Sequence, residues 1–191
     1  MTSLTVKQLC VGWLVRESGI VLEAHSTSSI ILGGRQVIVV DTSDRSLRPK
    51  VMETLGELGL RVEDVDIVVN THLHSDHSAN NDLFPNAKVL SHEAEGRRGD
   101  APDIGGGIEL EEGVRVVHTP GHTPGSVSVF IDGERRTVIA GDAIPTRDNY
   151  VKMVPPGLNY DPVLAMRSME MIVGWAEVIV PGHGPAFEVV H

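Results

Sequence analysis

The sequence predicts an α/β fold in which two β-sheets are covered on their outer faces by helices. Two blocks rich in strand-forming residues, 4–40 and 114–141, are separated and followed by segments of helical period. Strands and helices interleaved in this way bury apolar sheet faces against helices. The 191 residues are 41% hydrophobic and contain no internal repeat, so we expect a single domain over residues 1–191.

The elements follow from residue type and spacing. Runs rich in Val and Ile, broken by Gly or charged residues, predict a meander of strands through the first forty residues. Residues 48–59 place apolar side chains at helical spacing, with Pro49 early and Gly59 at the end, and predict a helix. A helical turn is expected at 78–84 and a second long helix at 162–175. Buried strands are expected at 65–70, 87–91, 114–119, 126–131, 136–141 and 176–180.

Composition and charge exclude several classes of protein. Acidic residues outnumber basic ones 26 to 16, and the basic residues are scattered, so nonspecific nucleic-acid binding is not expected. A short nucleic acid could still enter a metal centre, because metal ions supply positive charge. No run approaches the roughly 18 apolar residues of a membrane span, and the N-terminus lacks a secretory signal, so we expect a cytoplasmic protein. Cys10 is the only cysteine, which leaves no internal disulfide.

Metal-ligand side chains are concentrated in the loop "NTHLHSDH", residues 70–77. In an extended chain, side chains two residues apart point the same way, so His72 and His74 can bind one ion while Asp76 and His77 turn toward another. A catalytic zinc takes about three protein ligands, so this loop begins two sites and completes neither. Three further donors stand beside glycines later in the chain: His122, Asp142 and His183.

Five motifs, in order along the chain, resemble the metallo-β-lactamase superfamily: "VVDTS", "NTHLHSDH", "TPGHTPGS", "AGDA" and "PGHGP". The resemblance spans nearly the whole chain and implies a four-layer αββα sandwich. It also implies a metal centre with two ions. The first ion would be bound by His72, His74 and His122. The second would be bound by Asp76, His77 and His183, with Asp142 as the bridge and Asp41 in a supporting shell.

The implied ligand set indicates a chemistry. Five imidazoles and two carboxylates suit two zinc ions, with manganese or iron also feasible. Such a pair lowers the pKa of a shared water toward roughly 7 and stabilises the anion that develops on the substrate. Asp76 is the candidate catalytic residue, which would orient the nucleophile or relay its proton.

The motifs favour a hydrolase of a small ester, thioester or lactone, and two alternatives stay open. "NDLFPNAKVLSHEAE" resembles the branch of metallo-β-lactamase domain-containing protein 1, and residues 141–172 resemble in part the N-acyl homoserine lactonases, although Pro145 stands where those carry a tyrosine. The chain stops eight residues after His183, where glyoxalase II enzymes continue into a helical domain. A phosphodiesterase or ribonuclease would use the same centre, and a mononuclear iron sulfur dioxygenase shares much of the motif.

Two long segments, 96–107 and 145–162, have little predicted structure, and such segments often serve as lids. Candidate substrate-binding residues lie in the second: Tyr150, Tyr160, Arg147 and Lys152. We expect solvated or packed side chains at the histidines outside the motifs, His25, His92, His118 and His191, and an acidic surface at Glu93 and Glu95. The expected partner is a small-molecule substrate, without a membrane, and a homodimer is left open.

Overall fold

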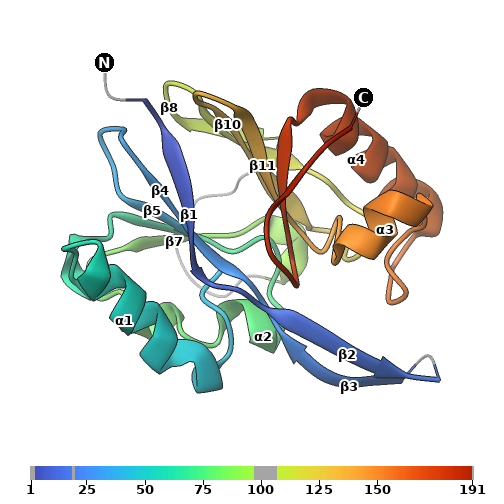
Figure 1. Ribbon diagram of the computed structural model, residues 1–191, viewed down its shortest axis with the longest axis horizontal. Helices are drawn as coiled ribbons and strands as arrows, with labels where there is room; N and C mark the ends of the chain where they lie inside the picture. The colour runs from blue at the N-terminus through green and yellow to red at the C-terminus, as the bar shows by residue number, and fades with distance from the viewer. Residues whose placement is uncertain (1–2, 19, 97–106, 191) are drawn as a thin grey trace.

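Alternating apolar residues build two β-sheets that pack face to face (Figure 1). The computed structural model describes residues 3–18, 20–96 and 107–190. The first sheet has the strand order β1 (Thr5–Cys10), β4 (Ser28–Leu32), β5 (Ile38–Val40), β6 (Ile67–Val69), β7 (Lys88–Leu90). The second has the order β13 (Phe187–Glu188), β12 (Val178–Pro181), β11 (Arg136–Gly141), β10 (Val127–Asp132), β9 (Val114–His118), β8 (Gly107–Glu111).

Helices cover the outer faces of both sheets, so the molecule has four layers. Helix α1 (Arg48–Glu57) packs on the first sheet, and α4 (Pro162–Trp175) packs on the second, beside α3 (Arg147–Lys152). The strand period of two decides which side chains face which layer. In β5, for example, Val40 joins the core between the sheets and Val39 joins the core under α1. The α/β architecture and the four-layer sandwich expected from the sequence are therefore confirmed.

Chain direction brings the functional loops to one edge of the sandwich. Strands β5 and β6 are parallel in the first sheet, and β11 and β12 are parallel in the second. Strand β9 runs in the same direction as β11, because each is antiparallel to β10. The segments that follow these five strands carry the ligand-type residues found in the sequence. A short helix, α2 (Ser75–Ser78), begins inside the histidine loop.

The hairpin of β2 (Trp13–Glu17) and β3 (Ile20–His25) extends away from both sheets (Figure 1). The apolar run 4–15 is typical of a single strand, but the chain turns at Gly12 and leaves the first sheet. A Cβ at Gly12 would lie 2.1 Å from the carbonyl oxygen of His25, so only glycine permits this crossing. The hairpin exposes several large apolar side chains, including Val15, Ile20 and Leu22.

The structure describes one of the two long segments, 145–162, and little of the other, 96–107. The segment 145–162 contains the six-residue helix α3, which lacks the length needed for a clear periodic signal. The expectation of a lid at 96–107 falls almost entirely on residues outside those the structure describes. Within the described chain, no helix has both the length and the apolar character to cross a membrane.

Candidate metal centre

The first group of ligand-type residues consists of His72, His74 and His122. Nδ1 of His74 lies 3.0 Å from Nε2 of His72 and 3.1 Å from Nε2 of His122. Three nitrogen ligands placed tetrahedrally about one zinc ion, with zinc–nitrogen distances of 2.0–2.1 Å, lie about 3.3 Å from one another. The observed spacing is close to this value, so the three rings have the convergence that a metal ion requires.

The second group consists of Asp76, His77 and His183. Oδ2 of Asp76 lies 3.7 Å from Nε2 of His77 and 3.8 Å from Nε2 of His183. One donor atom from each residue lies within 4.8 Å of the other two. His77 and His183 are buried, whereas the Asp76 side chain reaches the pocket described below.

Asp142 stands between the two groups. Its Oδ2 lies 3.4 Å from Nε2 of His122, and its Oδ1 lies 3.5 Å from Nε2 of His77 and 3.3 Å from Nε2 of His183. One carboxylate oxygen therefore faces each group. Gly182 makes this approach feasible, because a Cβ there would lie 2.0 Å from Oδ1.

Two buried polar atoms in the cluster have no hydrogen-bond partner among the described residues: Nε2 of His77 and Oδ1 of Asp142. A buried polar atom without a partner costs about 1–3 kcal/mol, and such atoms call for an explanation. A cation shared by the two groups would supply the missing partner, so the residues present fit metal ions.

Backbone and carboxylate acceptors orient the histidine rings. Nδ1 of His122 lies 2.7 Å from the carbonyl oxygen of Leu158, and Nδ1 of His183 lies 2.9 Å from that of His25. A carbonyl oxygen only accepts, so each Nδ1 carries the proton and each Nε2 presents its lone pair to the cluster. These bonds select the tautomer that a metal ion needs.

Asp41 holds the histidine loop from behind. The carboxylate accepts hydrogen bonds from the backbone N–H of Thr71 at 2.8 Å and from its hydroxyl at 2.7 Å. It also lies 2.8 Å from Nδ1 of His77. Asp41 is almost completely buried and has a φ of 55°, a left-handed conformation that non-glycine residues seldom adopt. Asp41 therefore lies behind the cluster in contact with Thr71 and His77, and the supporting role that the resemblance implies stays a prediction.

The pKa values differ between the two groups. Burial lowers the pKa of His72 well below its usual value and also lowers the pKa of His74. Burial opposes charge at His77 too, but the neighbouring carboxylates Asp41 and Asp142 raise its pKa well above the usual value. Burial would raise the pKa of Asp142, yet His183 and His77 hold it well below the usual value. Burial thus favours the neutral form of His72 and His74, which can bind a cation, whereas His77 has to release a proton to bind one.

Glu95 joins the two loops that carry the first group. Its Oε2 accepts from the backbone N–H of Leu73 at 2.9 Å, and its Oε1 accepts from the hydroxyl of Thr123 at 2.6 Å and from the N–H of Gly125 at 3.0 Å. The acidic surface expected at Glu95 does not include this contact between the two loops. The position of Glu95 shortly after β7 could have indicated this contact, because β7 neighbours β6, the strand that leads into the histidine loop.

A pocket of about 150 Å³ opens onto the cluster. The ligand-type residues in its wall are His74, Asp76, His122, Asp142 and His183. The remaining wall residues come from the β2–β3 hairpin and from the segment after Asp142: Leu14, Arg16, Val21, Ala24, Pro145, Pro156 and Leu158.

The four candidate substrate-binding residues are not among these wall residues. The Tyr150 ring packs against Phe187, with ring centroids 5.2 Å apart. Tyr160 is 68% exposed, although its backbone N–H donates to the carbonyl oxygen of His122 at 3.0 Å. Arg147 is exposed, and Lys152 pairs with an aspartate on its own helix. Contact of these side chains with a substrate stays a prediction.

The fold and the cluster define an α/β sandwich with a metal-binding edge, and known proteins share both. The sequence model of the metallo-beta-lactamase superfamily matches residues 22–102 and 94–183. A "probable metallo-hydrolase" of Methanocaldococcus jannaschii is 38% identical over 93% of this chain and 86% of its own length. Metallo-beta-lactamase domain-containing protein 1 of Xenopus laevis is 33% identical over 97% of this chain and 82% of its own length. The chain therefore belongs to the metallo-beta-lactamase superfamily, a family of metal-dependent hydrolases.

Two more distant proteins add to this comparison. An N-acyl homoserine lactonase of a Bacillus species is 28% identical over 70% of this chain and 62% of its own length. The crystal structure of a Thermotoga maritima protein of the metallo-beta-lactamase type superposes with a TM-score of 0.80. The match covers 97% of this chain and 99% of that one at 24% identity, which shows a common fold.

Proposed function

We propose that the protein is a hydrolase that binds two zinc ions and cleaves a small carboxylic ester, thioester or lactone. The observation that carries the proposal is the position of Asp142, whose two carboxylate oxygens face different groups of ligand-type residues. His72, His74 and His122 would hold one ion, and Asp76, His77 and His183 the other. The two buried atoms without partners lie where the groups meet, which supports this arrangement.

Bound ions would supply Lewis acidity and would lower the pKa of water toward roughly 7. The residues of the chain would orient the water, accept its proton and hold the histidine rings in place. Asp76 has a carboxylate on the pocket wall, so it is placed to orient an attacking water and to accept its proton. Asp41 and the carbonyl oxygens behind the rings would keep the histidine lone pairs aimed at the centre during turnover.

The size and lining of the pocket support a small, largely apolar acyl substrate. Its volume is about 150 Å³, which is roughly the volume that five water molecules occupy in the liquid at ~30 Å³ each. That space takes a short acyl group or a lactone ring, and a longer chain would extend along the hairpin. The relative named as an N-acyl homoserine lactonase supports carboxylic ester bonds as the target class.

A substrate screen tests the proposal. Protein loaded with zinc is assayed against p-nitrophenyl esters, γ- and δ-lactones, an acyl thioester and bis-p-nitrophenyl phosphate. We expect hydrolysis of at least one carboxylic ester, thioester or lactone, and a phosphodiester rate at least tenfold lower. Preferential phosphodiester cleavage, or no hydrolysis of any carboxylic substrate, would contradict the proposal.

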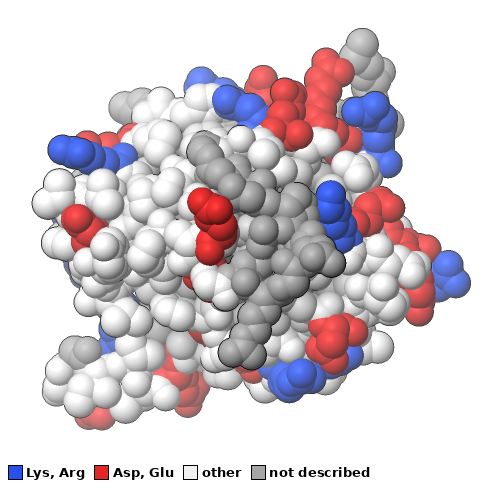
Figure 2. Space-filling model, turned by 180° about the vertical axis from the view of Figure 1, so that it is seen from behind, with Lys and Arg blue, Asp and Glu red and all other residues white. Residues whose placement is uncertain are grey.

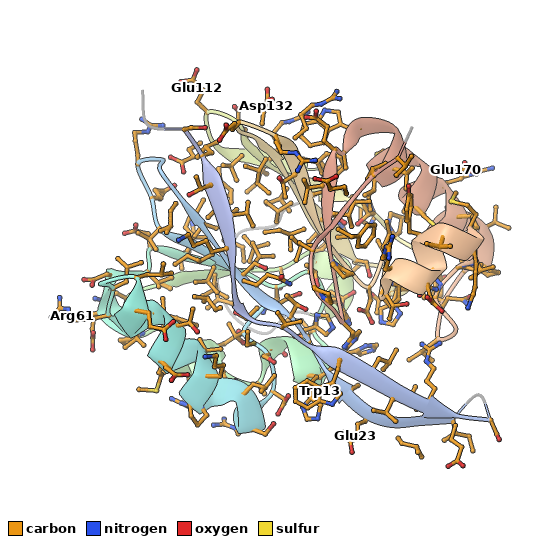
Figure 3. All side chains as sticks on the ribbon, viewed as in Figure 1. Trp13, Glu23, Arg61, Glu112, Asp132 and Glu170 are labelled. Atoms are coloured by element: carbon orange, nitrogen blue, oxygen red, sulfur yellow. The ribbon has the colours of Figure 1, made fainter. Side chains whose placement is uncertain are left out.

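Matched variants link the activity to the cluster. Asp142→Ala is expected to remove activity, because it takes one oxygen from each proposed site. Asp132→Ala is the control, because this exposed aspartate at the end of β10 is not a wall residue of the pocket. Figure 3 shows Asp132 at the opposite end of the molecule from Trp13 of the hairpin. Full activity in Asp142→Ala would mean that another part of the chain is the catalyst.

A further inference from the structure

Arg16 of the β2–β3 hairpin is the only lysine or arginine among the pocket wall residues that the structure describes. It pairs with Val21 across the hairpin, and Leu14 pairs with Ala24. These four residues all line the pocket. A register shift between Val15 and Arg16 places one additional residue in β3, so Val21 and not Leu22 stands beside Arg16. The bulge therefore helps to build the wall that contains the arginine.

The guanidinium of Arg16 rests on the opposite wall of the pocket. A Cβ added to Gly157 would lie 3.0 Å from Nη1 and 3.5 Å from Cζ of Arg16. The missing side chain at Gly157 thus leaves room for the guanidinium beside this residue. The arginine spans from the hairpin to the segment that also binds His122 through the carbonyl oxygen of Leu158.

No acidic side chain in the part of the chain that the structure describes pairs with Arg16. Among the described residues, no side-chain hydrogen bond or ion pair involves its guanidinium, which carries five N–H donors. Glu23, an acidic residue of β3, accepts from Nε1 of Trp13 at 3.1 Å. Trp13 and Glu23 lie together on the hairpin side turned away from α3 (Figure 3). The donors of Arg16 are therefore available to a ligand in the pocket.

The charge of the whole chain contrasts with the positive charge of Arg16. The formal net charge is −10, and the acidic residues on the face seen in Figure 2 are interspersed with scattered basic ones. A protein with this balance repels anions in general. The exposed guanidinium of Arg16 stands beside apolar residues of the pocket wall such as Leu14, Val21 and Leu158, and it offers one local point of attraction whose planar fork suits a carboxylate.

We propose that Arg16 selects substrates that carry a carboxylate on the part of the molecule that extends from the scissile bond toward the hairpin. This inference rests on the proposed hydrolase function and narrows its substrate class to anionic esters, thioesters or lactones. The apolar residues Leu14 and Leu158 would contact the carbon atoms between the scissile bond and the carboxylate.

A matched pair of esters tests the selection. The zinc-loaded enzyme is assayed with 4-acetoxybenzoate and with its neutral methyl ester, which differ in charge and have the same scissile bond. In Arg16→Gln we expect kcat/KM to fall roughly tenfold for the anion, as the loss of one charge-assisted hydrogen bond implies, and to change less than twofold for the neutral ester. Arg16→Lys should retain part of the preference, and Arg167→Gln, at an exposed arginine of α4, should retain all of it.

A binding measurement keeps the test independent of turnover. Isothermal titration compares dicarboxylates from succinate to suberate with monocarboxylates of equal carbon number on the zinc-loaded protein. In the wild type, at least one dicarboxylate should bind about tenfold more tightly than its partner, and Arg16→Gln and Gly157→Ala should both reduce this preference. Equal losses for both esters, or no dicarboxylate preference at any length, would overturn the role of Arg16. If neither ester is hydrolysed but the dicarboxylate preference is intact, the hydrolase function fails and the anion site stands.

Discussion

At the scale of single residues, the hydrogen bond that Nδ1 of a histidine ring makes determines whether Nε2 can bind a metal ion. His122 and His183 each give one N–H to a backbone carbonyl, and His77 approaches Asp41. The residues that gather in the cluster were predictable from the sequence, because the pattern of histidines and aspartates is dense and stands at the ends of strands. Their acceptors were not, because a backbone carbonyl can belong to any residue type.

Glu95 provides a prediction at this scale. Glu95→Gln replaces one accepting oxygen with an NH₂ group, which cannot accept the bonds now made to Leu73 or to Thr123 and Gly125. Loss of an outer-shell partner typically weakens a metal site about 10- to 100-fold. We expect the affinity of the His72, His74 and His122 site to fall by roughly tenfold. Competition against a chromophoric chelator measures it.

Glu93→Gln is the matched control, because this glutamate is exposed in the same short helix as Glu95. It should bind metal as the wild type does. Equal affinities in Glu95→Gln and Glu93→Gln would mean that Glu95 does not position the loops.

At the scale of elements, the two segments with clear helical spacing form helices α1 and α4, as predicted, and short-range contacts determine where elements end. Helix α1 ends at Glu57, two residues before the predicted end at Gly59, and α4 covers the whole predicted range, 162–175. The break at Gly12 could not be predicted, because its cause is the backbone of residues 25–27. For the same reason Arg16, directly after the apolar run 4–15, gave no sign of facing a pocket.

Asp44 links two elements and predicts a pH dependence. It caps the short helix η1 (Arg45–Leu47) by accepting from the N–H of Ser46 at 2.7 Å, and it lies 2.5 Å from Nδ1 of His25 at the end of β3. Partial burial would raise the pKa of Asp44, but Ser46 and His25 lower it below its usual value. A carboxyl with a lowered pKa stabilises the fold above its unfolded-state pKa of about 3.9, and loses this effect as the pH falls through its folded-state value.

Asp44→Asn keeps a capping oxygen and removes the charge. We expect it to lower the free energy of unfolding by about 1 kcal/mol at pH 7, since solvent screens this partly exposed pair. The difference from the wild type should shrink below pH 4. Urea denaturation of metal-free protein at pH 7, 5 and 3 measures it, and a difference that is constant over this range would refute the role of the charge.

At the scale of the whole molecule, two sheets bring five distant segments to one edge. The order of the motifs and the interleaved elements were sufficient to predict the four layers and to suggest which residues meet there. The wall of the pocket was not predictable, because it depends on a hairpin that leaves its sheet and on a segment with weak periodicity. The sequence therefore indicates the chemistry of the centre more clearly than it indicates the substrate.

The central claim is that Asp142 joins two separate metal sites. Native mass spectrometry of zinc-reconstituted protein tests it most directly, with the wild type compared with His74→Ala and His183→Ala. We predict two zinc ions in the wild type and one in each variant, because each substitution removes a ligand from only one group. A single ion in the wild type, or two ions retained in both variants, would contradict the claim.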